Sequence, residues 1–325
     1  MRDTYLDTSK AVLIFLVVLG HFLERMIGWN DPIGHTLLGT IYFVHMPAFI
    51  FISGVLFKDK NWFKNILFFI SLYVPFQILF PVFDAIWSGN IQINWNVFER
   101  PYWILWYLLG MMVWTLLTHL LIKTKFAVWI ALILALCVGL SPWNNYQYSV
   151  GRIFTFLPFF VIGAVYGKAM IQSIRSFRYA EWFAVLIFLG IVSFVYLSQI
   201  NQFWLYGSLS YQQLKVSAFD GTLMRLGCMA VSSLGIFAIF AIVKRCQSHF
   251  LKLGINTLAV YLLHGFVVIF ISKYWKLDSH IFIEIMICIG LSVLTCWVFQ
   301  QRIFDMLLRK MSLWLMKPVE KLGLK

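Results

Sequence analysis

The chain of 325 residues is 61% hydrophobic and only 12% charged, and it carries a net charge of +13. A soluble domain has roughly 25% charged residues, so a mean hydropathy of +0.83 excludes a soluble enzyme, a disordered chain and a disulfide scaffold together. Most of this surface has to face lipid. The five cysteines have neither paired nor metal-type spacing, and we expect free thiols and no bound metal.

Ten continuous apolar runs predict an all-α integral membrane protein, a polytopic bundle of about ten transmembrane helices. A helix that crosses a bilayer needs about 20 mostly apolar residues. In chain order the expected spans are 9–27, 37–57, 62–87, 101–122, 126–141, 151–171, 182–199, 219–243, 256–273 and 279–300. This pattern predicts one transmembrane domain over residues 1–301, followed by a tail over residues 302–325.

The positions of Lys and Arg predict the orientation of these spans. If the N-terminus is cytoplasmic, 19 of the 26 basic residues fall in cytoplasmic segments and seven fall outside. Because cytoplasmic loops are enriched in Lys and Arg, we expect both termini in the cytoplasm and no nucleic acid partner. The tail mixes Ile303, Leu307, Met311 and Trp314 with basic residues, a pattern typical of an amphipathic helix on the inner leaflet.

The first expected span carries an unusual row of ionisable residues. Asp7, Lys10, His21 and Glu24 are connected through Ile14 and Val17 by alternating steps of three and four residues, so they share one helix face. Lys10 and His21 lie about 16 Å apart at 1.5 Å per residue. A His beside a carboxylate suits proton abstraction from a hydroxyl group. The alternative is a structural His that hydrogen-bonds to another helix.

The same stretch resembles the first helix of the membrane acyltransferase-3 family. The family signature is Arg or Lys, then ten residues, then His, and Lys10 and His21 fit it, with Lys where Arg is common. The resemblance continues, in family order, through residues 45–54, 103–108, 152–163 and 256–264. Among the branches of the family, the sequence looks most like the one that resembles fucose 4-O-acetylase.

The resemblance implies an O-acyltransferase of the bacterial cytoplasmic (inner) membrane. Such an enzyme moves an acetyl group from cytoplasmic acetyl-CoA to a sugar hydroxyl of a cell-surface polysaccharide or its lipid-linked precursor. His21 would be catalytic with the help of Glu24, and Lys10, together with Asp7, would bind the acyl-CoA. The alternative function is a proton-coupled secondary transporter that uses His21, Glu24 and His264 as a relay, although no inverted repeat is visible. The sequence leaves open a homo-oligomer.

Four further residues are candidates for acceptor binding. Arg152 is placed to hold an anionic sugar or to stabilise transition-state charge, or else it extends to the membrane interface. His45 and His264 are candidates to line the active cavity, and a hydrogen bond between helices is the alternative for His45. Trp106 is expected either to stack on a sugar ring or to belong to an aromatic belt at the interface.

Overall fold

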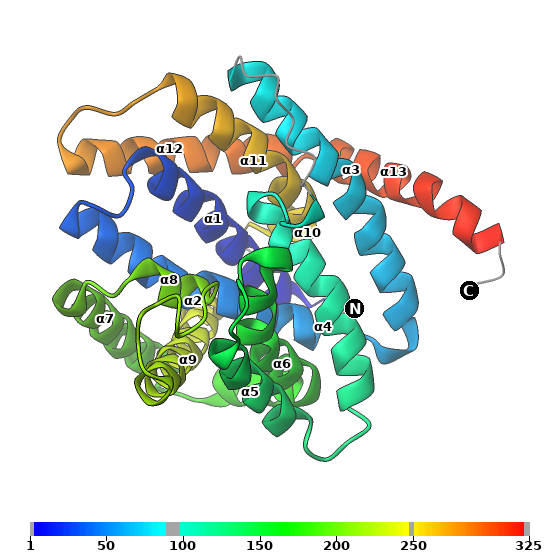
Figure 1. Ribbon diagram of the computed structural model, residues 1–325. Coiled ribbons are helices and arrows are strands. Elements are labelled where there is room, and N and C mark those ends of the chain that lie inside the picture. The colour runs from blue at the N-terminus through cyan, green and yellow to red at the C-terminus, as the bar shows by residue number, and fades with distance from the viewer. Residues whose placement is uncertain (1–2, 89–97, 247–249, 322–325) are drawn as a thin grey trace. The chain divides into compact units, whose positions relative to one another are not determined.

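The computed structural model describes residues 3–88, 98–246 and 250–321, and every regular element in these ranges is a helix (Figure 1). Residues 322–325 of the expected tail, and Arg2 and Lys325 among the counted cations, lie outside the described residues. The all-helical architecture predicted from the apolar runs is therefore confirmed over the described part of the chain.

Nine helices in the described ranges are long and apolar enough to cross a membrane. They coincide with nine of the ten expected spans. The helices that form these spans are α1 (Thr4–Met26), α2 (Pro32–Val55), α3 (Trp62–Ser88), α4 (Trp106–Leu121), α6 (Val150–Ser176), α7 (Ala180–Ser198), α9 (Ala218–Val243), α11 (Thr257–Tyr274) and α12 (Ile281–Phe299).

The expected span at 126–141 is shorter than predicted. Helix α5 (Ala127–Cys137) has 11 residues and ends in a single 3₁₀ turn, Val138–Leu140. Eleven residues rise about 16 Å, roughly half of a hydrocarbon core about 30 Å thick. The run is apolar throughout, so composition alone did not show that α5 stops at Cys137, five residues before Pro142.

The tail forms one long helix, α13 (Arg302–Lys321). Ser312 is buried on one side of this helix and shares a hydrogen bond of 2.6 Å with Ser71 of α3. Ile303, Leu307 and Trp314 are exposed along another stripe. The amphipathic helix expected from the sequence is thus present, while its position on a lipid leaflet stays a prediction.

The chain divides into two compact units. The first comprises Met1–Ile52, Tyr166–Tyr206 and Met224–Arg302, and the second comprises Ser53–Val165, Gly207–Leu223 and Ile303–Lys325. Within the first unit, α1 packs against α11, α12 and the short helix α10 (Leu251–Ile255). Most of α1 is buried by these neighbours, so its ionisable face lies inside protein and not against lipid.

Candidate active site

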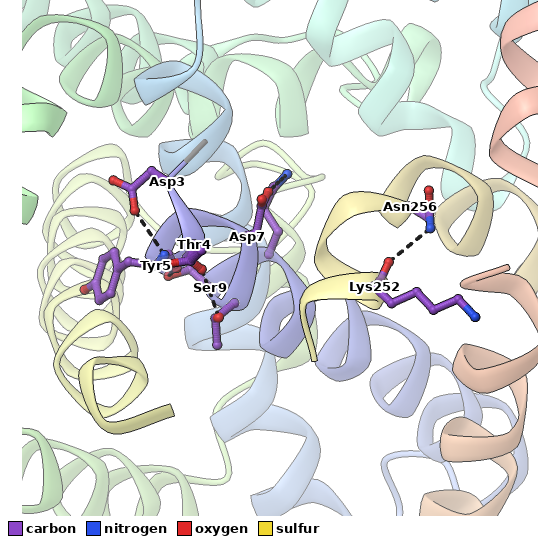
Figure 2. A network of polar contacts seen from close by, with 9 residues as sticks. Asp3, Thr4, Tyr5, Asp7, Ser9, Lys252 and Asn256 are labelled. Atoms are coloured by element: carbon purple, nitrogen blue, oxygen red, sulfur yellow. Dashed lines mark hydrogen bonds and ion pairs between the residues drawn. The ribbon is translucent and has the colours of Figure 1, made fainter. Parts of the chain in front are cut away.

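Helix α1 positions the ionisable residues that the sequence singled out. The helix begins after Asp3, whose carboxylate accepts a hydrogen bond of 3.0 Å from the Tyr5 backbone N–H. The Ser9 hydroxyl donates to the Tyr5 carbonyl at 2.8 Å (Figure 2). The Tyr5 phenol donates to the Phe240 carbonyl at 2.6 Å. These bonds satisfy the polar groups of the first turns, which fixes the start of the helix.

Lys10 and Asp7 form an ion pair near this start. The Lys10 Nζ lies 2.8 Å from the Asp7 Oδ1, and the two side chains are 16% and 6% exposed. Figure 2 shows this end of α1 beside α10. The approach is so close that a Cβ added at Gly254 of α10 would overlap the Asp7 carbonyl oxygen. Asp7 therefore holds Lys10 in place while α10 covers Asp7.

Three helical turns further along α1, His21 lies beside Glu24. The His21 Nδ1 is 3.5 Å from the Glu24 Oε2, and the side chains are 13% and 21% exposed. The spacing of three residues predicted this contact, because side chains at i and i+3 meet on a helix surface. The His21 ring also stacks on the His264 ring of α11, with 5.4 Å between centroids and 20° between planes.

His45 and His264 belong to the same cluster. The His45 ring lies edge-on to the Tyr42 ring with 4.7 Å between centroids, and His264 is the ring that stacks on His21. Each buried ring directs Nδ1 at a backbone carbonyl four residues earlier: that of Ile41 at 2.7 Å for His45 and that of Val260 at 2.9 Å for His264. A carbonyl oxygen only accepts, so both rings carry a proton on Nδ1. These bonds are intrahelical, unlike the interhelical bond considered for His45.

Three aromatic residues that sequence reasoning missed complete the cluster. Tyr42 of α2 donates to the Glu24 Oε2 at 2.7 Å, and Tyr206 of α8 (Gln202–Tyr206) donates to the Glu24 Oε1. The Trp29 Nε1 donates to the Tyr206 hydroxyl at 2.9 Å. The only signal in the sequence was the concentration of aromatic residues at 203–206.

The other two candidates, Arg152 and Trp106, lie together in the second unit. The Arg152 guanidinium is 5.4 Å from the Trp106 ring centroid and 5.8 Å from that of Tyr146. The Arg100 guanidinium also lies over the Tyr146 ring, 3.9 Å from its centroid. Trp106 is only 7% exposed and packs against Trp114 and Phe156, so its burial argues against a place in an aromatic belt facing lipid.

We next consider whether the described side chains could bind a metal ion. Within the described residues, no group of three or more His, Cys, Asp or Glu side chains is arranged to hold an ion. The histidine and carboxylate cluster of the first unit is instead built around one His–Glu contact and its phenol donors. This arrangement suits proton transfer, in which an imidazole takes a proton and a carboxylate stabilises the cation that forms.

Comparison with known proteins identifies the class. The family model described as an acyltransferase domain, that of the acyltransferase-3 family, matches residues 3–300. The chain therefore belongs to this family, and the resemblance drawn from the first helix is confirmed. The chain is also similar to the nodulation protein NolL of Mesorhizobium japonicum, with 25% identity over 86% of this chain and 82% of the relative.

A second relative is similar to a slightly smaller extent. The nodulation protein NolL of Sinorhizobium fredii is 24% identical over 81% of this chain and 77% of its own length. No solved structure matches the chain significantly. Family membership favours the first of the two functional classes that the sequence left open: the protein is an acyltransferase, and its long apolar helices indicate a multi-pass membrane protein.

Proposed function

We propose that the protein is an O-acetyltransferase of the bacterial cytoplasmic membrane. It takes an acetyl group from cytoplasmic acetyl-CoA and transfers it to a sugar hydroxyl of a cell-surface polysaccharide or a lipid-linked precursor. The observation that carries the proposal is the contact between His21 and Glu24 on a helix that also presents Lys10. The excess of basic residues in the expected cytoplasmic loops supports cytoplasmic termini, with Lys10 nearer the cytoplasm than His21.

Lys10 is the proposed site for the phosphates of acetyl-CoA. A Lys ammonium binds phosphate as a point charge, without the bidentate fork of Arg. Asp7, at 2.8 Å, keeps Lys10 oriented and lowers the cost of its position inside the protein. The pantetheine arm then runs along α1, and the separation of about 16 Å between Lys10 and His21 is the distance that the arm has to span.

His21 is the proposed general base. Its Nε2 takes the proton of the acceptor hydroxyl while the hydroxyl oxygen attacks the thioester carbonyl carbon. Glu24 beside Nδ1 stabilises the imidazolium that forms. As the tetrahedral intermediate collapses, the carbon–sulfur bond breaks, the new ester bond remains, and the thiol of CoA leaves with the proton from His21.

Each unit contains residues that are proposed to bind the acceptor. In the first unit His264 stacks on His21, and His45 contacts Tyr42, which bonds to Glu24. Both histidines are candidates to border the reacting hydroxyl. Arg152 above Trp106 offers a cation and an aromatic surface in the second unit, and these suit an anionic or ring-shaped acceptor.

The test is acetyl transfer by membranes that contain His21→Ala. Labelled acetyl-CoA is added, and surface glycans and lipid-linked sugars are then analysed by mass. Loss of a general base lowers the rate by about 10²- to 10⁴-fold, and the variant should still accumulate in the membrane. His119→Ala is the matched control, because His119 is a histidine of the second unit that pairs with Asp59 and has no proposed part in the reaction. Full activity of His21→Ala would rule out the mechanism.

A further inference from the structure

We infer that Tyr206 and Tyr42 are positioning residues that fix the Glu24 carboxylate against His21, so that the segment around α8 completes the active site. This inference rests on the proposed function. Tyr206 is separated from Glu24 by 182 residues, and it comes from a segment with no ionisable residue of its own between 199 and 205. Because the Tyr206 phenol donates to the Glu24 carboxylate, the role of Tyr206 is to act through Glu24.

The two phenols occupy different oxygens of the carboxylate. Tyr42 donates to Oε2 at 2.7 Å, the oxygen that also faces the His21 Nδ1, and Tyr206 donates to Oε1. A carboxylate with one donor is free to rotate about its last torsion, whereas donors on both oxygens from two different elements fix the plane of the group. Glu24 thus presents Oε2 to His21 in one orientation.

The direction of the hydrogen bonds follows from the donor chemistry. An indole N–H is a donor only, so the Tyr206 oxygen accepts the bond from the Trp29 Nε1 at 2.9 Å. The hydroxyl proton of Tyr206 is then directed to the Glu24 Oε1. Trp29 also contacts the rings of Tyr42 and Tyr206 edge-on, with centroids 5.5 and 6.0 Å apart, which limits the movement of both phenols.

His35 connects the two chain segments that supply these donors. Its ring nitrogens lie 3.1 Å from the Trp29 carbonyl and 2.9 Å from the Ile200 carbonyl, and the side chain is buried. The turn after α1, which carries Trp29, is thereby joined to the residues just before α8, which carries Tyr206. The position of the Tyr206 hydroxyl is consequently set by the same contacts that place Trp29.

This arrangement matters for catalysis because Glu24 has to be in place when His21 becomes positively charged. A preorganised carboxylate stabilises the imidazolium without rearranging during the reaction. If the phenols are removed, Glu24 samples other rotamers and the interaction weakens at the moment of proton transfer. Neither phenol is required for the binding of acetyl-CoA near Lys10, so the loss falls on kcat and not on the KM for acetyl-CoA.

A double-mutant cycle tests the inference. Tyr206→Phe should lower kcat roughly 10- to 100-fold, because a misplacement of about 1 Å costs up to about 10²-fold, with the KM for acetyl-CoA within about twofold of wild type. Adding Tyr206→Phe to Glu24→Gln should cost nothing further, because residues that act as a unit are not additive. The same result is expected for Tyr42→Phe.

Tyr5→Phe is the matched control, since Tyr5 is a buried tyrosine of the same unit whose phenol bonds to the Phe240 carbonyl and not to Glu24. Its effect should multiply with that of Glu24→Gln. Thermal unfolding of each variant in detergent checks that it is folded. Wild-type kcat in Tyr206→Phe, or losses that multiply with Glu24→Gln, would overturn the inference. Activity of His21→Ala in the same assay would instead show that the proposed function fails.

Discussion

Single side chains show how much of this site follows from helix geometry. The sequence places Asp7, Lys10, His21 and Glu24 on one face of α1 in two steps of three residues, and in the structure the Asp7–Lys10 and His21–Glu24 pairs lie at 2.8 and 3.5 Å. These pairs are local, so the 3.6-residue period determines them before any tertiary contact forms. The partners of Glu24 are not local, and no spacing in the sequence identifies Tyr42 or Tyr206.

At this scale we predict the effect of removing the Lys10 charge. Lys10→Gln should raise the KM for acetyl-CoA by at least about 10-fold with a smaller change in kcat, because hydrogen bonds to charged groups contribute about 1.5–3 kcal/mol. Lys10→Arg should preserve most of the affinity, since the family signature admits either cation. Steady-state kinetics with membranes or with detergent-purified protein measures both parameters.

Two controls accompany the Lys10 variants. The double variant Asp7→Asn with Lys10→Gln removes the buried carboxylate together with its cation, so it should fold as wild type and still show the raised KM. Lys123→Gln removes a basic residue from another expected cytoplasmic loop and should leave the KM unchanged. An unaltered KM in Lys10→Gln would exclude Lys10 from the acetyl-CoA site.

Among the helices, the contact between α1 and α10 shows the closest packing at the site. A side chain at Gly254 would meet the backbone of Asp7, and backbone atoms yield less readily than the end of a flexible side chain. Asn256, at the end of α10, donates to the Gln300 carbonyl at 2.7 Å and to the Lys252 carbonyl at 3.1 Å. Because α10 is anchored in this way, it has little room to move away from α1.

We therefore predict that Gly254→Ala destabilises the protein. Overpacking of this kind costs about 1–3 kcal/mol, visible as a lower Tm in detergent and as a raised KM for acetyl-CoA if Asp7 and Lys10 shift. Gly227→Ala in α9 and Gly290→Ala in α12 are matched controls, since a Cβ at either position meets nothing within 4 Å. These two should be neutral or stabilising by up to about 1 kcal/mol. Equal Tm values for all three variants would contradict the prediction.

For the whole molecule, the distribution of charge predicts orientation across the bilayer. The basic loops assign residue 60 to the cytoplasm and residue 276 to the outside. In a background without the five natural cysteines, Lys276→Cys should react with an impermeant maleimide added to intact spheroplasts. Lys60→Cys should react only after permeabilisation. Both positions are exposed in the structure, so the comparison is not limited by burial, and the reverse labelling pattern would reject cytoplasmic termini.

The length of the spans could be predicted only in part from the same apolar runs. Nine of the ten expected spans are helices of sufficient length among the described residues. The run at 126–141 is as apolar as the others, yet α5 ends at Cys137. An apolar residue is equally suited to lipid and to the interior of a protein. The hydropathy of a run therefore does not by itself show at which residue a helix stops.

The sequence by itself determined the class of this protein and one face of its site. Lipid requires long apolar helices, and the helical period places Asp7, Lys10, His21 and Glu24 on one stripe, so these features needed no tertiary information. Only the tertiary structure decided what surrounds that stripe: the histidines of α2 and α11, the phenols on Glu24 and the approach of α10. Those contacts join residues far apart in the chain, and their positions depend on how the helices pack against one another.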